Sequence, residues 1–464
     1  MTTTDSTAPV SAPRVLFKSV NIFDGDSDEL LEGQDVLVEG ELIKAVGADL
    51  SADGASIVID GTGQTMTPGL IDMHQHLMLG GQEGLFNAAE NRDFATIGAI
   101  AAQNMYAHML MKGITTVRDV AGNSLGLAVA TKDGSLSGPR IYSSGPALAP
   151  PGGHTDIGGW NQTHAKDESV LMSLHAEVSG REEVTRQARW NFRKGAAFLK
   201  AMPGGGVASQ FDPLEVVNLT LDEMKAAVEI AADHKTYVTV HAYRDDAVNR
   251  SLDAGVKCVE HNFLVSEDTI IRMAEEGTVL SLQGFVAGVQ FAHPEVVPWY
   301  TAEQIRKAKQ VHVGTLQMVE WAKQHGVFII SGSDMFAENW PIAKKNITIE
   351  VDLFGFTAVE ALRHATGNAG KVLEMSGPAR NPYHDGPLGV IAEGAYADIL
   401  LWAEDPTNDI MVLEDESKLG LIMKGGELYK NTLVSDTDPT YRPAPTMRIS
   451  PTNPELVQRN GCCI

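Results

Sequence analysis

The sequence predicts an α/β protein: a (β/α)8 TIM barrel with a small β-sandwich domain built from both ends of the chain. Short apolar runs alternate with helix-like stretches between residues 67 and 384, and alternating strands and helices indicate a parallel sheet. Eight such runs fall within about 260 residues, which is the size of a (β/α)8 barrel. β-rich fragments punctuated by Gly and Asp also occur near both ends of the chain. A doubly wound sheet is the alternative, but no Gly-x-Gly-x-x-Gly motif follows the first strand.

The sandwich is expected over residues 15–66 and 385–433. In the first segment, runs such as Val36-Leu37-Val38 are separated by Gly and Asp turns, which is typical of hairpins. The second segment repeats this pattern, for example in Ile399-Leu400-Leu401. Residues 1–14 are rich in Thr, Ser and Pro and are expected to be a flexible N-terminus. The Pro-, Thr- and Asp-rich residues 434–464 are expected to be an irregular tail.

The barrel is expected over residues 67–384. The segments Thr220 to Glu223 and Thr357 to Glu360 match capping boxes that open apolar-periodic runs, so helices are expected to begin there. The predicted strands are Gly69–His76, Ile114–Val120, Arg140–Ser144, Ala196–Met202, Tyr237–Tyr243, Cys258–His261, Val279–Gln283 and Phe328–Ser331.

The composition narrows the possible partners. The 464 residues carry 36 Lys and Arg against 60 Asp and Glu, a formal charge of −24. Nucleic acid and anionic membranes repel such a chain, so neither is an expected partner. The three cysteines, two of which are the adjacent Cys462 and Cys463, exclude a disulfide framework and favour a reducing compartment. Because the N-terminus has no apolar signal segment, the sequence predicts a cytoplasmic protein.

Groups that can bind metal recur at the predicted strand ends. His74 and His76 are two residues apart in the first strand, so both imidazoles lie on one face. His241 and His261 end two neighbouring strands, and Asp334 follows the last strand. Because barrel active sites form at the C-terminal ends of the strands, we expect these groups to converge. Imidazole and carboxylate ligands suit zinc or a related divalent ion.

Lys200 lies in the apolar run Ala196–Met202, near the end of the fourth predicted strand. A lysine in this place is expected to be desolvated, which lowers its pKa and frees a neutral amine. Beside two cations, that amine could be held as a carbamate formed with carbon dioxide, whose two oxygens can bridge two metals. The alternative is a lysine that snorkels from the rim of the barrel into solvent.

Several motifs together resemble the amidohydrolase superfamily, across nearly the whole chain. They are Thr67-Pro68-Gly69-Leu70-Ile71-Asp72-Met73-His74-Gln75-His76, Gly113-Ile114-Thr115-Thr116-Val117-Arg118-Asp119, Gly138-Pro139-Arg140, Lys200, His241, His261, Ser333-Asp334, Ala361-Leu362-Arg363-His364-Ala365-Thr366 and Gly394-Ala395-Tyr396-Ala397-Asp398-Ile399-Leu400. Within the superfamily, the chain is similar to the binuclear prolidase and carboxypeptidase-like branch, which includes the ochratoxin-degrading amidases. The resemblance implies a homo-oligomeric hydrolase with two divalent ions, zinc by default.

The resemblance also implies a role for each candidate residue. The implied metal ligands are His74 and His76 for one ion, His241 and His261 for the second, and Lys200, as N6-carboxylysine, between the two. Asp334 would contact the first ion and act as the general base on a bridging hydroxide. His154, in the segment Gly152-Gly153-His154, and Tyr243 would polarise the substrate carbonyl. The alternative, structural roles are a solvated loop histidine for His154 and a packing residue for Tyr243.

The implied reaction is hydrolysis of a peptide-like amide, such as a dipeptide, an N-acyl amino acid or an aryl amide like ochratoxin A. Arg118, Arg244 and His293 are candidate anchors for a substrate carboxylate, and Val207 is a candidate substrate contact. Apolar and aromatic residues on the loops can line a pocket or equally bury a subunit interface; they are Phe86, Phe263, Phe285, Phe291, Trp299, Phe336 and Trp340.

Other functions on the same barrel stay open at this point. A mononuclear deaminase or cyclic-amide hydrolase is one. Such a site would have a glutamate shortly after the histidine of the fifth strand, and the segment His241-Ala242-Tyr243-Arg244 contains none. A lactone or ester hydrolase is another, because a two-metal centre can also attack an ester. A non-catalytic assembly protein is a third, although such a chain would be expected to have lost ligands that are present here.

Overall fold

The computed structural model describes residues 14–79, 94–156, 174–209, 211–297, 300–335 and 337–433. The predicted tail and almost all of the predicted flexible N-terminus lie outside these residues, as do Phe86, Trp299 and Phe336. Among the described residues, the chain divides into two compact units, residues 14–69 with 385–433 and residues 70–384.

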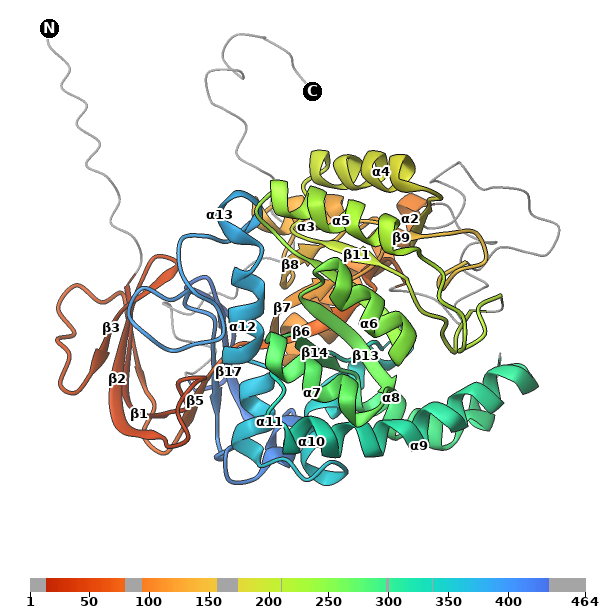
Figure 1. Cartoon of the computed structure of the whole chain (residues 1–464). Helices are drawn as coiled ribbons and strands as arrows, with labels where there is room; N and C mark the ends of the chain where they lie inside the picture. Colours follow the sequence, from red (N-terminus) through yellow and green to blue (C-terminus); the bar gives the residue numbers. More distant parts are fainter. Residues whose placement is uncertain are drawn as a thin grey trace, which may run out of the picture. The chain divides into compact units, whose positions relative to one another are not determined.

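The first unit combines strands from both ends of the chain (Figure 1). Its strands are β1 (Arg14–Ile22), β2 (Leu31–Glu39), β3 (Leu42–Gly47), β4 (Ile57–Asp60), β5 (Thr65–Pro68), β16 (Ile399–Trp402), β17 (Leu419–Lys424) and β18 (Glu427–Asn431). They form one sheet in the order β18-β17-β16-β5-β1-β2-β3, with β4 paired to β1. The antiparallel pair of β5 and β16 joins the two ends of the chain, and Trp402 Nε1 donates to Thr67 Oγ1 there at 3.0 Å. A division of these strands into two stacked sheets stays a prediction.

The second unit contains two sheets in which all strand pairs are parallel. One sheet has the order β6-β7-β8 and the other has the order β10-β9-β11-β12-β13-β14-β15. The strands are β6 (Leu70–Gln75), β7 (Ile114–Asp119), β8 (Arg140–Ser143), β9 (Ala147–Ala149), β10 (His175–Glu177), β11 (Leu199–Ala201), β12 (Val238–Arg244), β13 (Cys258–Leu264), β14 (Val279–Leu282) and β15 (Ile329–Ser331).

All eight strands predicted from the sequence are found in these sheets, with ends that differ by a few residues. The short strands β9 and β10 were not predicted, because three apolar or mixed residues carry no periodic signal. Backbone hydrogen bonds run between the sheets from Ala197 N to the Ser143 carbonyl at 2.8 Å and from Asp334 N to the His74 carbonyl at 2.9 Å. Closure of the two sheets into one barrel stays a prediction.

Helices flank the parallel strands of this unit on their outer side (Figure 1). They are α2 (Phe94–His108), α3 (Leu125–Lys132), α4 (Arg181–Arg193), α5 (Leu221–Asp233), α6 (Asp245–Ala254), α7 (Glu267–Glu276), α8 (Gly284–Gly288), α9 (Ala302–Gln324), α10 (Lys345–Asp352), α11 (Ala358–His364), α12 (Gly367–Glu374) and α13 (Gly377–Arg380). Both predicted capping boxes are confirmed, at Thr220 with Glu223 and at Thr357 with Glu360. In each box, the Thr hydroxyl accepts from the backbone N–H of the Glu, and the Glu carboxylate accepts from the backbone N–H of the Thr. Two backbone donors at the start of the helix are satisfied in this way.

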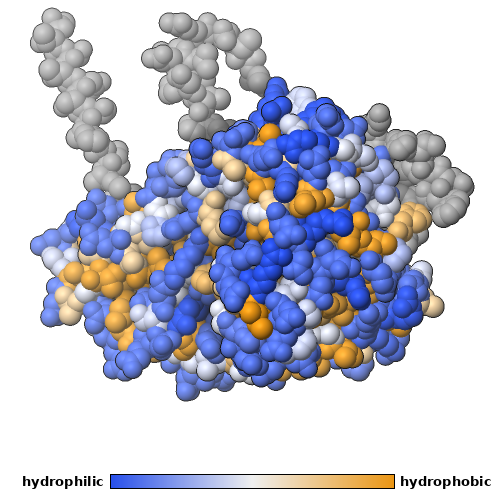
Figure 2. Space-filling model, viewed as in Figure 1, coloured by the Kyte–Doolittle hydropathy of each residue, from blue (hydrophilic) through white to orange (hydrophobic). Residues whose placement is uncertain are grey.

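The face of the molecule in Figure 2 is largely hydrophilic, with small apolar patches scattered over it. Among the helices that the structure describes, none has the length and apolar character that crossing a bilayer requires. In the second unit, many large apolar side chains are packed together in a buried cluster that includes Phe192, Leu199, Val240 and Val259.

Candidate metal centre

Four histidines meet at the C-terminal ends of the parallel strands. His74 lies in β6, His241 in β12 and His261 in β13, and His76 directly follows β6. The ring centroids are 5.1 Å apart for His74 and His76, 5.0 Å for His74 and His261, and 4.5 Å for His241 and His261. Parallel pairing produces this cluster, because the carboxyl ends of neighbouring parallel strands lie at one edge of a sheet.

Asp334 completes the cluster from the segment after β15. Its Oδ1 lies 3.4 Å from His74 Nε2 and 3.2 Å from His76 Nε2, and one ligand atom from each of these three residues falls within 4.8 Å of the others. Burial raises the pKa of the Asp334 carboxyl, but His74 and His76 outweigh burial and hold it below its usual value. Asp334 is therefore a carboxylate at neutral pH.

The backbone is strained where it carries two of these side chains. His261 has a φ of 77° and Asp334 a φ of 52°, and neither is a glycine. Left-handed backbone costs a non-glycine residue free energy and persists only where the surrounding structure imposes it. Here it aims an imidazole and a carboxylate into the same space.

Three of the histidines are neutral. Burial lowers the pKa of His74 to about 4, and it lowers the pKa values of His241 and His261 well below the usual value. For His76, the opposing effect of Asp334 outweighs burial and raises the pKa. Neutral imidazoles offer a lone pair, which is the form that binds a metal.

Lys200 lies on β11 with its side chain pointing into the same cavity. Its residue exposure is only 1 %, and its amine has no hydrogen-bonding partner among the described residues. Burial lowers the pKa of the amine to about 8. The expectation that Lys200 is desolvated is confirmed, and a lysine that snorkels into solvent is excluded.

The donor set fits divalent cations. His74 Nδ1 lies 2.9 Å from Glu260 Oε2 and donates to it, so His74 Nε2 faces Asp334 Oδ1 with a lone pair. Two acceptors that face each other at 3.4 Å repel unless a positive charge lies near both. Nitrogen and carboxylate ligands of this kind suit zinc and related ions.

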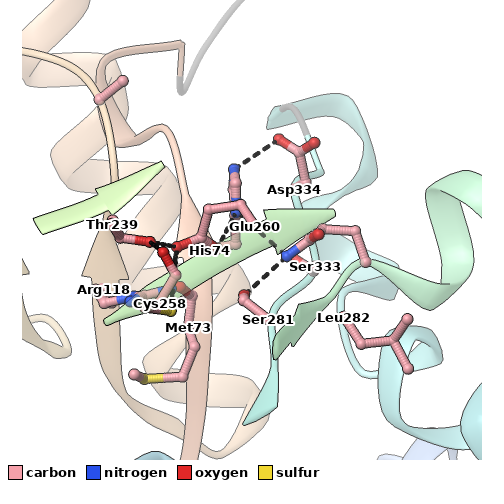
Figure 3. Close-up of polar contacts among 12 residues, drawn as sticks. Met73, His74, Arg118, Thr239, Cys258, Glu260, Ser281, Leu282, Ser333 and Asp334 are labelled. Atoms are coloured by element: carbon pink, nitrogen blue, oxygen red, sulfur yellow. Dashed lines mark hydrogen bonds and ion pairs between the residues drawn. The ribbon is translucent and has the colours of Figure 1, made fainter. Parts of the chain in front are cut away.

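A buried ionic network lies beneath His74 (Figure 3). Glu260 Oε1 accepts from Arg118 Nη2 at 2.6 Å, and Arg118 Nε donates to the Met73 carbonyl at 2.7 Å. The Thr239 hydroxyl donates to the same Glu260 oxygen. Burial raises the pKa of Glu260, but the Arg118 guanidinium and the Lys200 amine outweigh it and hold the pKa well below the usual value.

Sequence reasoning missed Glu260, although a signal was available. An acidic residue inside the apolar run Cys258–His261 needs a buried partner. Arg118 was considered as an anchor for a substrate carboxylate. The structure instead places its guanidinium on Glu260, fully buried and outside the cavity lining.

A second buried carboxylate ties β6 to the segment that carries Asp334. Asp72 accepts from the Ser333 amide at 2.8 Å, the Ser333 hydroxyl at 2.6 Å and the Gln75 side chain at 2.6 Å. It also accepts from the His74 amide at 3.1 Å. Asp72 was not singled out from the sequence, where it reads as part of an apolar strand.

The metal-binding candidates line one cavity. His154, Tyr243 and Val207 also line it, so the structure brings these predicted residues to the site. Burial raises the pKa of Tyr243 well above its usual value, so its hydroxyl keeps its proton. The rest of the wall is largely apolar, with Leu79, Leu174, Met202, Val286, Phe291 and Tyr300.

Two further candidates lie elsewhere. The His293 side chain is 74 % exposed, with Glu295 at 3.9 Å, and neither His293 nor Arg244 is among the residues that line the cavity. Of the predicted aromatic residues, Phe291 lines the cavity, whereas Trp340 is buried and donates to the Met335 carbonyl at 2.9 Å.

Comparison with known proteins agrees with this geometry. The sequence model of the Amidohydrolase family matches residues 65–429. Ochratoxinase of Aspergillus niger is 29 % identical over 377 residues, which cover 79 % of this chain and 75 % of that protein. The crystal structure of A. niger ochratoxinase superimposes with a TM-score of 0.80 at 25 % identity, over 94 % of this chain and 99 % of that one.

A prolidase crystallised with N-methylphosphonate-L-proline is also similar. It superimposes with a TM-score of 0.81 at 30 % identity, over 90 % of this chain and 100 % of that one. The structural neighbours establish a TIM-barrel-like α/β fold for this chain. From the family match and these neighbours together, the chain belongs to the amidohydrolase family, on the branch that holds prolidases and ochratoxinase.

Proposed function

We propose that this protein is a binuclear metal-dependent hydrolase of peptide-like amide bonds. The observation that carries the proposal is the buried Lys200 amine, which has no hydrogen-bonding partner among the described residues and lines the same cavity as the histidines. An orphaned buried donor costs about 1–3 kcal/mol, so its retention calls for a bound group. Carboxylation of Lys200 would convert the amine and carbon dioxide into a carbamate with release of a proton, and the two carbamate oxygens, which share one negative charge, suit cations.

The ligands divide into two sets around Lys200. His74, His76 and Asp334 would hold one ion, and His241 and His261 would hold the other, with the carboxylated Lys200 shared between them. Two bound divalent ions, zinc in our proposal, would supply a water that loses a proton near neutral pH.

The protein's own groups would then move the protons and orient the amide. Asp334 is ionised and would accept a proton from that water, then pass it to the leaving amine. Tyr243 keeps its hydroxyl proton and lines the cavity with His154, so both can donate to the carbonyl oxygen as it gains charge.

The cavity wall favours substrates with an apolar group beside the scissile amide. Aliphatic and aromatic side chains such as Leu174, Val286 and Phe291 form much of that wall, and apolar walls with few polar groups are typical of small-molecule sites. Among the similar proteins are an ochratoxinase and a prolidase. Dipeptides, N-acyl amino acids and aryl amides such as ochratoxin A are the proposed substrates.

The wider organisation of the molecule is part of the same proposal. Residues 67–384 would form the closed barrel, and residues 15–66 with 385–433 would form a separate sandwich domain. We also propose a homo-oligomer located in the cytoplasm, in keeping with the branch to which the chain belongs and with its few cysteines.

The proposal is tested by metal content and hydrolysis measured together. Protein supplied with zinc and bicarbonate is analysed by elemental mass spectrometry and then assayed on dipeptides, N-acyl amino acids and ochratoxin A. We expect two metals per chain and cleavage of the amide bond. A single metal with deamination, or two metals with lactone cleavage, in either case without amide cleavage, would favour the alternative enzymes on this barrel.

A further inference from the structure

We infer that Asp212 is a positioning residue that holds His154 in place against the substrate; the inference rests on the proposed function, in which His154 meets the substrate carbonyl. Asp212 is fully buried, and its Oδ2 lies 2.7 Å from His154 Nδ1. Ser209 Oγ lies 2.9 Å from the same nitrogen and accepts the Thr155 amide at 2.9 Å. With Nδ1 donating to Asp212, Nε2 is the ring nitrogen left to meet a substrate in the cavity, and it donates to a carbonyl oxygen when the ring carries both protons.

The imidazole is also fixed face to face on a neighbouring ring. His154 stacks on His241, with centroids 3.8 Å apart and an angle of 13° between the planes. Gly206 makes this stack possible, because a Cβ there would lie 2.2 Å from His154 Cε1 and Nδ1 and 2.9 Å from His241 Nε2. Only a glycine leaves room for both rings, which gives a physical role to the last residue of the Gly204-Gly205-Gly206 run.

The segment that carries Asp212 is itself anchored. Gly206 N donates to Asp212 Oδ2 at 2.7 Å. The same carboxylate oxygen therefore bonds both the backbone of Gly206, against which the ring packs, and the His154 ring itself. Lys307, on α9, donates to the carbonyls of Gly206 and Asp212, both at 2.9 Å. Gln304, one turn earlier on the same helix, donates to the Ala208 carbonyl at 2.7 Å.

These contacts form a chain from a long helix to a single imidazole. A charge-assisted bond to a buried carboxylate is about twice as strong as a neutral one. A carboxylate that orients a metal-ligating histidine typically contributes about 10–100-fold to affinity or activity, and we expect an effect of the same order for His154, which faces the substrate. Without Asp212, His154 would keep its stack but lose the bond that fixes the rotation of its ring. Fewer molecules would then present Nε2 to the carbonyl.

The experiment compares Asp212→Ala with Glu215→Ala, a matched control. Glu215 is an exposed carboxylate three residues further along the same segment. The zinc-loaded proteins are assayed on the substrate identified for the wild type, with metal content measured in parallel. We expect Asp212→Ala to lower kcat about 10–100-fold, with KM and metal content unchanged, and Glu215→Ala to match the wild type.

A double-mutant comparison separates positioning from a general structural role. If Asp212 acts through His154, adding Asp212→Ala to His154→Ala lowers kcat no further. Losses that multiply in the double variant would overturn the inference, as would a normal kcat in Asp212→Ala. If Asp212→Ala does not fold, Asp212→Asn is tested instead, because it keeps the side-chain volume and removes the charge. An unchanged kcat in Asp212→Asn would also overturn the inference.

A crystal structure of zinc-loaded Asp212→Ala gives a readout that does not depend on activity. We expect the His154 ring to be rotated, or spread over several orientations. If the wild type binds two metals but cleaves no amide, the proposed function fails and this structure alone decides the inference. A His154 ring unchanged in position and orientation would overturn it.

Discussion

Replacing Glu260 by Gln would test the network beneath His74, with effects on both stability and metal binding. Arg118 is fully buried, and Glu260 is its one carboxylate partner in the described part of the chain. Unit charges about 4 Å apart attract by about 4 kcal/mol at an effective dielectric constant of 20. Removing one partner of a buried pair costs about 3–5 kcal/mol, because the other charge stays buried. We therefore expect the free energy of unfolding to fall by about 3–5 kcal/mol.

The same substitution changes the hydrogen bonding of His74. The two oxygens of Glu260 accept from Arg118 and from His74 Nδ1. A Gln offers one acceptor and one donor group, and Arg118 can only donate, so the amide NH2 would face His74. His74 Nδ1 would then carry the lone pair and Nε2 the proton, so the nitrogen that faces Asp334 would have no lone pair for a metal. We expect metal affinity to fall at least about 10–100-fold.

The assays are urea unfolding of the metal-free protein and zinc titration against a competing chelator. Thr239→Val is the matched control, because it removes a neutral donor to the same Glu260 oxygen and leaves the charge pair and His74 in place. It should cost about 1 kcal/mol and leave zinc affinity unchanged. Zinc affinity in Glu260→Gln equal to that of the wild type would refute the tautomer argument, and an unchanged urea midpoint would refute the argument about the buried charge.

Three further predictions concern the proposed centre. Lys200→Ala should abolish amide cleavage and lower bound metal, with partial rescue by added acetate or propionate; an active variant that keeps two metals would contradict the carbamate. Asp334→Asn should keep the fold and much of the metal but lose about 10²–10⁴-fold in kcat, because it removes the group that carries the proton; near-normal turnover would exclude Asp334 as the base. In metal-free protein at constant dissolved CO2, the rate of zinc-dependent reactivation should rise about tenfold per pH unit up to about pH 8 and then level off, because the Lys200 amine is protonated below its pKa of about 8. A rate still rising at pH 10 would show that the amine has its ordinary pKa.

The sequence predicted the parallel strands of the second unit well because their signal is local. Buried parallel strands read as continuous apolar runs, and β12, β13 and β14 fall within two or three residues of their expected bounds. The convergence of His74, His241 and His261 was also predictable, since strand ends share an edge whatever the details of packing. The buried state of Lys200 followed from the apolar run around it.

Other features were decided only by tertiary structure. Arg118 could not be placed from its sequence, because its partner Glu260 is 142 residues away along the chain. The link between Asp212 and His154 spans 58 residues and depends on loops that carry no periodic pattern. Apolar periodicity shows which residues are buried, but it cannot show which buried charge meets which. The sequence alone therefore determined the strands and the set of candidate metal-binding groups, whereas the fold determined the pairings that fix their tautomers, charges and orientations.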